Sequence, residues 1–254
     1  MKLSIVIVNY NTPELVYACL ESIARYVREP HQVIVVDNAS THAPDPSRLP
    51  IGTVYLPLPR NIGFGGGNNA GAKLAIGEYL WFLNSDTLLP DDSHTEMVRF
   101  MDQHLEYSVA SPLLFLDPEC RILQPDFYAY FQSLWTLLTH IVRPTLDLSQ
   151  PYQTVNLVVG AALMIRRRRF AEIGGFDEQI FMYMEDDDLC YRAGKAAIVT
   201  GARVIHLQGS SISVNSERKQ LYYASQKYFW QKHYGLGKTL LMRLLRAPYI
   251  LLKR

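Results

Sequence analysis

Four consecutive acidic residues, Glu185 to Asp188, form the densest group of reactive side chains in the sequence. Neighbouring like charges repel, so such a run is either solvated or gathered at the amino terminus of a helix, where the macrodipole favours anions. The second arrangement suits an ionised carboxylate that accepts a proton. Asp188 can form an ordinary ion pair with Arg192 four residues later, whereas Asp186 has no such partner in the sequence.

Polar residues also follow three short apolar runs, as Asn9-Tyr10-Asn11, Asp37-Asn38 and Asn84-Ser85-Asp86. Asn and Asp begin turns and cap helices, so each group has an ordinary structural explanation. In open α/β sheets, however, ligands bind beyond the carboxyl ends of the strands. Three such ends together favour one shared crevice.

A glycine-rich segment, Arg60 to Gly71, leads into a helical pattern and resembles a nucleotide loop, because bare backbone can approach a phosphate or sugar closely. Gly65-x-Gly67-x-x-Ala70 also fits the dinucleotide-binding pattern, but it does not follow the first strand. His206 closes an apolar run and is either a polar packing residue or a metal ligand.

The apolar runs predict the elements that must position these groups. Short continuous apolar runs that alternate with helical patterns are typical of a parallel sheet covered on both faces. We therefore predict an α/β, doubly wound fold. Strands are expected at 3–8, 32–37, 53–56, 78–83, 158–165, 196–200 and 203–207, and helices at 13–27, 69–76 and 185–193. Thr12 is a candidate cap for the first helix, with Pro13 in its first turn.

Composition excludes several classes of protein. The chain has 254 residues, 48% hydrophobic and 19% charged, with a net charge of +1, which indicates a globular protein and not a dedicated nucleic-acid binder. Residues 238–254 hold five basic and no acidic side chains, whereas the preceding 237 residues hold 20 basic and 24 acidic ones. An acidic body thus ends in a basic tail.

The sequence favours a cytoplasmic protein. Its three cysteines are far apart and form no Cys-x-x-Cys pair, which suggests a reducing compartment. The apolar run after Lys2 is too short for a signal peptide. No stretch reaches the roughly 18 apolar residues of a membrane-spanning helix. The uncharged segment Phe127 to Val142 could line a channel, join a dimer or touch lipid.

Seven motifs in order resemble the inverting glycosyltransferases of family two, especially their rhamnosyltransferase-like branch. They are SIVIVNYNT, VVDNAS, NIGFGGGNNAG, FLNSDT, VVGAALMIRR, GGFDEQIFMYMEDDDLCYR and VIHLQGSS. The resemblance covers most of the chain. It implies a GT-A fold, a mostly parallel sheet of two abutting Rossmann-like halves with flanking helices. Residues 1–106 would bind the donor. Residues 107–215 would bind the acceptor and supply the catalytic groups, and 216–254 would form a helical, basic end.

The resemblance also implies roles for individual residues. Tyr10 and Asp37 match positions that hold the nucleoside of the donor, and Asn11, Asn84 and Asp86 are assigned to donor binding with them. The donor diphosphate and sugar would lie along the glycine-rich segment, at Asn61, Gly63, Phe64 and Asn69. Asp86 matches the last carboxylate of an Asp-x-Asp signature that binds a divalent metal, Mg²⁺ or Mn²⁺, and His206 matches a further ligand. Here the signature reads Asn84-Ser85-Asp86, so an amide replaces one carboxylate.

The acidic run matches the position of the catalytic base in the family, with Asp186 as the base and Glu185 or Asp187 next in line. A hexosyltransferase reaction is implied, from dTDP-rhamnose or a UDP-sugar to a saccharide or lipid-linked acceptor in polysaccharide synthesis. Leucines among the cations of the tail are typical of an interfacial helix on an anionic membrane, although a helix packed on the body has the same composition.

Two other functions are compatible with parts of the sequence. A nicotinamide-dependent oxidoreductase would use the Gly65-x-Gly67-x-x-Ala70 pattern, but it would leave Asp86, the acidic run and His206 without roles. A non-catalytic sugar-nucleotide binding module would explain the missing signature carboxylate. Retention of all the other motifs favours the enzyme.

Overall fold

The computed structural model describes residues 1–139, 143–207 and 216–252. The strands of its main sheet are β1 (Leu3–Asn9), β2 (His31–Asp37), β3 (Val54–Pro57), β4 (Tyr79–Asn84), β5 (Thr87–Leu88), β6 (Val109–Phe115), β8 (Tyr152–Val155), β10 (Ala162–Arg166) and β11 (Ala196–His206). Their order is β3-β2-β1-β4-β10-β6-β11-β5, and β8 pairs with β11. Strands β5, β8 and β10 run against the other six, so the sheet is mostly parallel, as predicted.

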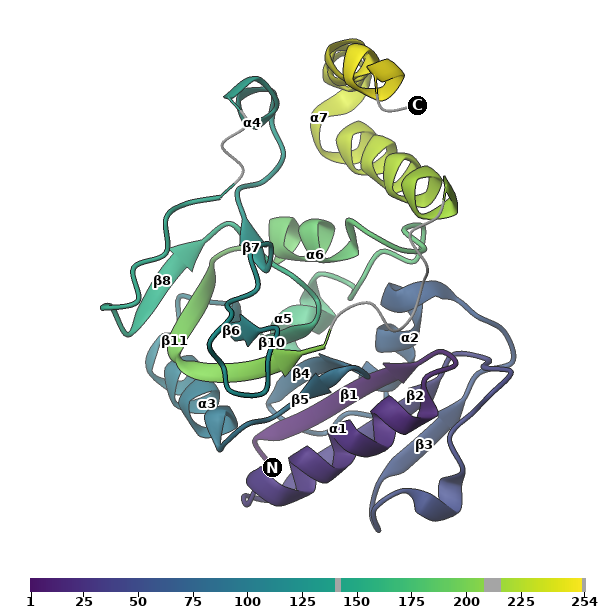
Figure 1. Cartoon of the computed structure of the whole chain (residues 1–254), viewed down its shortest axis with the longest axis vertical. Coiled ribbons are helices and arrows are strands. Elements are labelled where there is room, and N and C mark those ends of the chain that lie inside the picture. Colours follow the sequence, from purple (N-terminus) through teal and green to yellow (C-terminus); the bar gives the residue numbers. More distant parts are fainter. Residues whose placement is uncertain (140–142, 208–215, 253–254) are drawn as a thin grey trace.

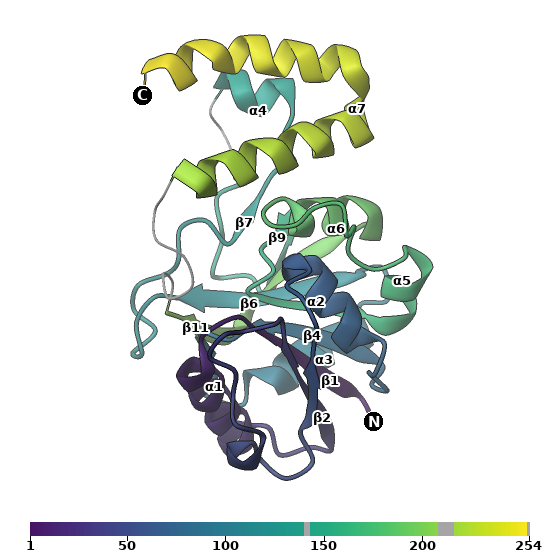
Figure 2. The ribbon, with the colours of Figure 1, turned by 90° about the vertical axis from the view of Figure 1, so that its right-hand side faces the viewer.

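Helices cover both faces of this sheet (Figures 1 and 2). They are α1 (Pro13–Tyr26), α2 (Gly63–Ala72), α3 (Ser93–Gln103), α4 (Leu134–Thr139), α5 (Arg167–Glu172), α6 (Glu185–Ala193) and α7 (Ser216–Leu252), with a 3-10 turn at Pro46–Arg48. Helices α1 and α3 pack on one face, and α2 and α5 on the other (Figure 2). A separate two-stranded antiparallel sheet of β7 (Tyr128–Ala129) and β9 (Leu157–Val158) lies beside the main sheet.

The first βα unit forms as the sequence predicts, with one local difference. Pro13 occupies the first turn of α1, where its missing N–H costs no hydrogen bond. Thr12 precedes the helix, but its side chain makes no capping bond. Its hydroxyl instead contacts Asn9 Oδ1 at 3.0 Å and Ser85 Oγ at 2.9 Å. The threonine therefore joins the ends of β1 and β4.

Helix α2 begins earlier than predicted, at Gly63 and not near Asn69, and ends at Ala72. The prediction failed because a run of glycines has low helix propensity. Tertiary packing explains the helix: a Cβ at Gly67 would lie 2.9 Å from Val8 Cγ1, and one at Gly65 2.9 Å from Phe176 Cβ. Glycine therefore lets α2 approach β1 closely. The Gly65-x-Gly67-x-x-Ala70 pattern is helix packing in this fold, not a dinucleotide loop.

Two strand predictions need correction in the second half of the chain. The run 158–165 is interrupted by a turn, so that β9 ends at Val158 and β10 begins at Ala162. The runs 196–200 and 203–207 form one strand, β11, whose pairing with β6 shifts register between Val199 and Arg203. The predicted helix at 185–193 is α6.

Helix α7 breaks at Gly235, whose φ of 78° is not helical. In the part before the break, Phe229 and Trp230 pack with Met184 and with Met242 from the part after it. Figure 1 shows both parts of α7 beyond α6, away from α1. None of the helices in the described ranges combines the length and the apolar character needed to cross a bilayer.

Candidate active site

A cavity of about 330 Å³ opens at the carboxyl ends of β1, β2 and β4, where the three polar strand ends meet. Parallel strands bring their carboxyl ends to one edge of a sheet, which is why residues distant in sequence converge there. The acidic run and His206 reach the same cavity from α6 and β11. It is lined by Val8, Tyr10, Thr12, Asn38, Asn61, Phe64, Asn84, Ser85, Asp86, Gln124, Val159, Gly160, Ala161, Met182, Tyr183, Glu185, Asp186 and His206.

The first two strand ends contribute unequally to this lining. Tyr10 lines the cavity and is 43% exposed. Asp37 is buried and is not part of the lining. Asn9 Nδ2 donates a hydrogen bond to Asp37 Oδ1 at 2.8 Å. Asn11 also lies outside the lining, and its Oδ1 accepts from the backbone N–H of His42 at 3.0 Å.

The glycine-rich segment reaches the cavity through Asn61 and Phe64 only. Asn38 holds Asn61 in place, because Asn38 Nδ2 donates to Asn61 Oδ1 at 3.0 Å. Gly63 is buried outside the lining, with a φ of 79° and Phe181 O close to the place of a Cβ.

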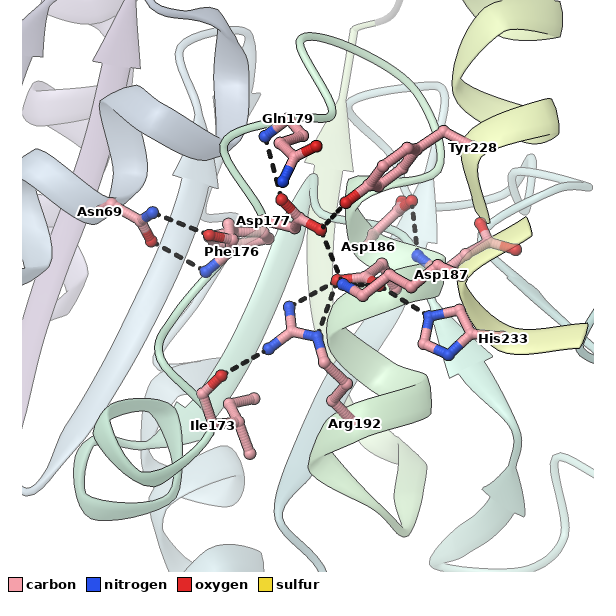
Figure 3. A network of polar contacts seen from close by, with 12 residues as sticks. Asn69, Ile173, Phe176, Asp177, Gln179, Asp186, Asp187, Arg192, Tyr228 and His233 are labelled. Carbon is pink, nitrogen blue, oxygen red and sulfur yellow. Dashed lines mark hydrogen bonds and ion pairs between the residues drawn. The ribbon is translucent and has the colours of Figure 1, made fainter. Parts of the chain in front are cut away.

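Asn69 lies away from the cavity, on the far side of α2. Its Nδ2 donates to Phe176 O at 2.9 Å and its Oδ1 accepts from the backbone N–H of Phe176 at 2.8 Å. Both polar ends of the side chain thus bind the loop before α6 (Figure 3). The position joins the two halves of the chain.

Asn84, Asp86 and His206 form one polar group at the floor of the cavity. His206 Nε2 lies 3.3 Å from Asp86 Oδ1 and 3.3 Å from Asn84 Nδ2. The other ring nitrogen, Nδ1, is 2.9 Å from Gln124 Oε1, so a proton on Nδ1 would leave the Nε2 lone pair facing Asp86. Asn84 Oδ1 is buried and has no hydrogen-bond partner within the described ranges.

The acidic run occupies the first turn of α6, as its composition suggested. The two residues before the helix, Tyr183 and Met184, have φ of 65° and 69°, a left-handed conformation that is costly for side chains of this size. Burial and the neighbouring Asp186 charge raise the pKa of Glu185 and of Asp187 well above their ordinary values.

Asp186 differs from its neighbours because backbone N–H groups stabilise its charge. Burial raises its pKa, but the N–H of Gly160 donates to Oδ2 and that of Asp187 to Oδ1, both at 3.0 Å, and these bonds oppose the rise. Of the three carboxyls at 185–187, Asp186 therefore most readily stays ionised.

Asp188 does not line the cavity. It is fully buried, and Arg192 Nε donates to its Oδ2 at 2.7 Å, which confirms the predicted ion pair. Lys232 and His233 of α7 also contact it, at 2.6 and 2.7 Å. Sequence reasoning missed these two partners, because 44 and 45 residues separate them from Asp188.

A second cavity, of about 420 Å³, is also lined by the acidic run, through Glu185, Asp186 and Asp187. The two cavities share the lining residues Val159, Tyr183, Glu185 and Asp186. The remaining walls of the second cavity come mostly from the segment around α4 and from α7. They are formed by Asp126, Ala129, Tyr130, Gln132, Thr136, Leu157, Met184, Asp187 and Tyr222.

The first part of the uncharged segment 127–142 thus lines the second cavity. Residues 140–142 lie outside the described ranges. Sequence reasoning placed Asn38 at a polar strand end without a specific role, and it assigned no role to Gln124 or Gly160. Asn38 and Gly160 fall within quoted motifs, whereas Gln124 follows an irregular stretch that carries no recognisable pattern.

The sheet order and the cleft at its carboxyl edge define the GT-A class of glycosyltransferase folds. Among solved structures, fragment 1–349 of TarS from S. aureus in complex with UDP-GlcNAc superposes with a TM-score of 0.61 at 18% identity. That match covers 98% of this chain and 72% of the TarS chain. At this identity the likeness concerns the fold alone.

The family model described as Glycosyl transferase family 2 matches residues 4–174, more than half of the chain. The chain therefore belongs to this family. A relative in Haloferax volcanii, low-salt glycan biosynthesis hexosyltransferase Agl10, is 30% identical over 214 residues, which cover 78% of this chain and 64% of Agl10.

Two named rhamnosyltransferases are similar over shorter stretches. Rhamnosyltransferase WbbL of Escherichia coli is 26% identical over 54% of this chain and 56% of its own length. The N-acetylglucosaminyl-diphospho-decaprenol L-rhamnosyltransferase of Mycobacterium tuberculosis is 46% identical over 61 residues, 22% of this chain and 20% of that protein. The chain thus spans less than two thirds of the length of these relatives.

Proposed function

We propose that this protein is an inverting hexosyltransferase that moves a sugar from a nucleoside-diphosphate donor to a hydroxyl of a saccharide or lipid-linked acceptor. Residues 1–106 bind the donor, and 107–215 supply the base and most of the acceptor site. The family assignment supports sugar transfer in glycan synthesis, and the named relatives favour a rhamnosyl donor. The complex of TarS with UDP-GlcNAc makes UDP-hexoses the competing donors.

The observation that carries this proposal is the position of Asp186 between the two cavities. The first cavity holds the donor, because Tyr10, Asn61 and Asp86 line it. The second holds the acceptor, because Tyr130 and Tyr222 offer ring faces and Gln132 and Thr136 offer hydrogen bonds, which together suit a sugar. A base that lines both cavities can take a proton from one substrate while that substrate attacks the other.

In the proposed reaction, an acceptor hydroxyl loses its proton to Asp186 as its oxygen attacks the anomeric carbon of the donor. The bond between this carbon and the diphosphate oxygen breaks, and its electron pair leaves with the nucleoside diphosphate. Attack from the face opposite the leaving group inverts the configuration. Burial raises the pKa of Asp186, which makes it a stronger base than an exposed aspartate.

Asn84, Asp86 and His206 would hold the divalent metal that the family implies. The buried Asn84 Oδ1 without a partner fits a metal ligand, and so does His206 Nε2, which carries a lone pair when the ring proton is on Nδ1 beside Gln124. Within the described ranges no group of three His, Cys, Asp or Glu side chains that could hold a metal is found, and oxygens of the donor diphosphate would add to the ligands that these residues offer. Bound there, Mg²⁺ or Mn²⁺ would neutralise charge on the leaving diphosphate.

We further propose that the part of α7 after Gly235 rests on an anionic membrane at the cytoplasmic face. Helix positions lie about 100° apart, so the exposed leucines of this part share one side, and Lys238 and Arg243 lie at its borders. Exposed leucines flanked by cations suit a lipid interface. The leucines are Leu236, Leu240, Leu241, Leu244 and Leu245, with exposed fractions from 41% to 71%. The side chains beyond 245 lie outside the description.

A binding and turnover assay tests the proposed reaction. Nucleotide sugars, dTDP-rhamnose and UDP-hexoses first, are screened for thermal stabilisation with and without Mn²⁺, because a ligand of the native state raises its stability. With the donor that binds, Asp186→Asn should lower turnover by about 10²-fold or more and leave donor affinity nearly intact. Asp187→Asn is the matched control.

The outcomes separate the alternatives. Wild-type turnover in Asp186→Asn with a loss in Asp187→Asn would transfer the role of base to Asp187. Donor binding without any turnover over a panel of saccharide acceptors would favour the non-catalytic module instead. Stabilisation by a nicotinamide dinucleotide and by no nucleotide sugar would contradict the transferase proposal.

A further inference from the structure

One face of α7 clamps the loop and helix that carry the acidic run. The residues of this face are three or four positions apart, the spacing of one side of a helix. They are Ser225, Tyr228, Phe229, Lys232 and His233. All lie beyond residue 174, where the match to the family model ends.

The earlier residues of this face, Ser225 and Phe229, hold the strained turn before α6. Ser225 Oγ donates to Met182 O at 2.8 Å, and the Met184 side chain packs against the buried Phe229. Tyr183 and Met184 both have left-handed backbone, a conformation that persists only where the surroundings enforce it. The contacts from α7 provide that enforcement at the two residues immediately before the acidic run.

The later residues of this face, Lys232 and His233, contact a buried group of polar and charged side chains on α6 (Figure 3). Asp188 Oδ1 accepts from Lys232 Nζ at 2.6 Å and from His233 Nε2 at 2.7 Å, while Arg192 occupies Oδ2. Lys232 Nζ also donates to Asp177 Oδ2 at 2.7 Å, so it joins the loop to the helix. Asp188 is two residues from Asp186 and lies in the same helical turn.

We propose that Lys232 and His233 are positioning residues for the sugar transfer, which fix the first turn of α6 so that the Asp186 carboxylate stays between the two cavities. This inference rests on the proposed function. Helix α6 has only nine residues, too few to be stable without tertiary contacts. Removing both hydrogen-bond donors leaves the buried Asp188 carboxylate with Arg192 alone, a costly state that a shift of α6 towards water would relieve.

Steady-state kinetics of the full chain test the proposal with the variant Lys232→Met/His233→Phe. The phenylalanine keeps an aromatic ring to pack on Tyr191 and Phe229 and removes both ring nitrogens, so the hydrogen bond to Asp188 is lost. We expect kcat to fall about 10- to 100-fold, because small displacements of a reacting group have effects of this size, with an unchanged KM for the donor. Lys232→Arg and His233→Gln, which keep donors, should restore most of kcat.

Lys227→Met is the matched control, because Lys227 lies on the same helix and is exposed. It should behave like the wild type. A folded double variant with wild-type kcat would overturn the proposal. So would equal losses of kcat and donor affinity that the conservative variants do not rescue, because these indicate a general structural role.

Hydrogen exchange provides a readout that does not depend on the reaction. In the double variant, the amides of 182–188 should exchange at least about 10-fold faster, whereas those of β1 stay protected, since local opening follows local contacts. Unchanged exchange at 182–188 refutes the clamp even if sugar transfer is established. Faster exchange in a protein that transfers no sugar supports the clamp and counts against the proposed function alone.

Discussion

The backbone N–H of Gly160 donates a hydrogen bond to Asp186 Oδ2 at 3.0 Å, across 26 residues of sequence. Gly160 lies in the turn between β9 and β10, and the Phe64 ring of α2 packs over it. The proposed base is thus held by a turn that also touches the wall of the donor cavity. This link gives the first prediction.

Gly160→Ala should lower kcat by about 10-fold. The new Cβ would lie 2.9 Å from Phe64 Cε1, so the turn must move and weaken the bond to Asp186. A hydrogen bond to a charged group contributes about 1.5–3 kcal/mol, and 1.4 kcal/mol corresponds to tenfold in rate. Gly237→Ala, where a Cβ meets nothing within 4 Å, is the control. An unchanged kcat in Gly160→Ala would show that this bond does not affect the base.

The acidic run should make the protein less stable as pH rises. Burial raises the pKa of Glu185 and Asp187 above their ordinary values of 4.5 and 3.8, so the folded chain binds these protons more tightly than the unfolded chain. Their contribution to stability is therefore fully present below the ordinary values and is lost as pH rises through the raised ones.

Asp187→Asn removes one of these groups and should raise the melting temperature at pH 8. The difference from the wild type should shrink as pH is lowered towards 4, where the native carboxyl is protonated. Melting curves by circular dichroism over this range measure it. A variant that is less stable than the wild type at pH 8 would mean that the carboxylate is stabilised by contacts absent from the structure.

Gln124→Leu should weaken the binding of the metal at His206. Gln124 Oε1 lies 2.9 Å from His206 Nδ1 and orients the ring, and loss of such a partner typically costs about 10- to 100-fold in metal affinity. We expect the Mn²⁺ concentration for half-maximal turnover to rise by this factor. The exposed Gln103→Leu serves as control. Full activity of the wild type after chelation of divalent metals would refute the metal site itself.

The leucines of α7 should determine binding to anionic vesicles. Leu240→Gln/Leu244→Gln removes two side chains that are 57% and 71% exposed, so the fold has little to lose. Burying a leucine contributes about 1.5–3 kcal/mol, so the partition coefficient should fall by at least about 10-fold in flotation with phosphatidylglycerol vesicles. Leu105→Gln, at a 76% exposed leucine on another surface, is the control. Equal flotation of all three proteins would exclude this surface as the contact.

Several elements could be predicted because their signals are local. Buried parallel strands consist of continuous apolar residues, and Pro13 and the acidic run marked helix starts. Helix α2 was placed too late, because its glycines serve contacts with Val8 and Phe176 that no local pattern records. The strand β11 was divided in two for a similar reason, since its register shift depends on β6.

In the candidate site, too, some features have local signals in the sequence and others depend on tertiary packing. The order of the motifs identified the family, and the strand ends marked the cleft that Tyr10, Asn61 and Asp86 line. Asn69 and Gly63 belong to the same motif as Asn61, yet they lie outside the lining, because successive residues of a helix point about 100° apart and only some of them face any one surface.

The sequence by itself determined the α/β class, the family and the presence of a carboxylate run at a helix start, because these depend on residue type and near spacing. Only the tertiary structure decided which carboxylate stays ionised, through the distant N–H of Gly160, and that Asp188 binds Lys232 and His233. Burial and long-range hydrogen bonds arise when separate elements pack together. Their effect on a side chain therefore appears only once the chain is folded.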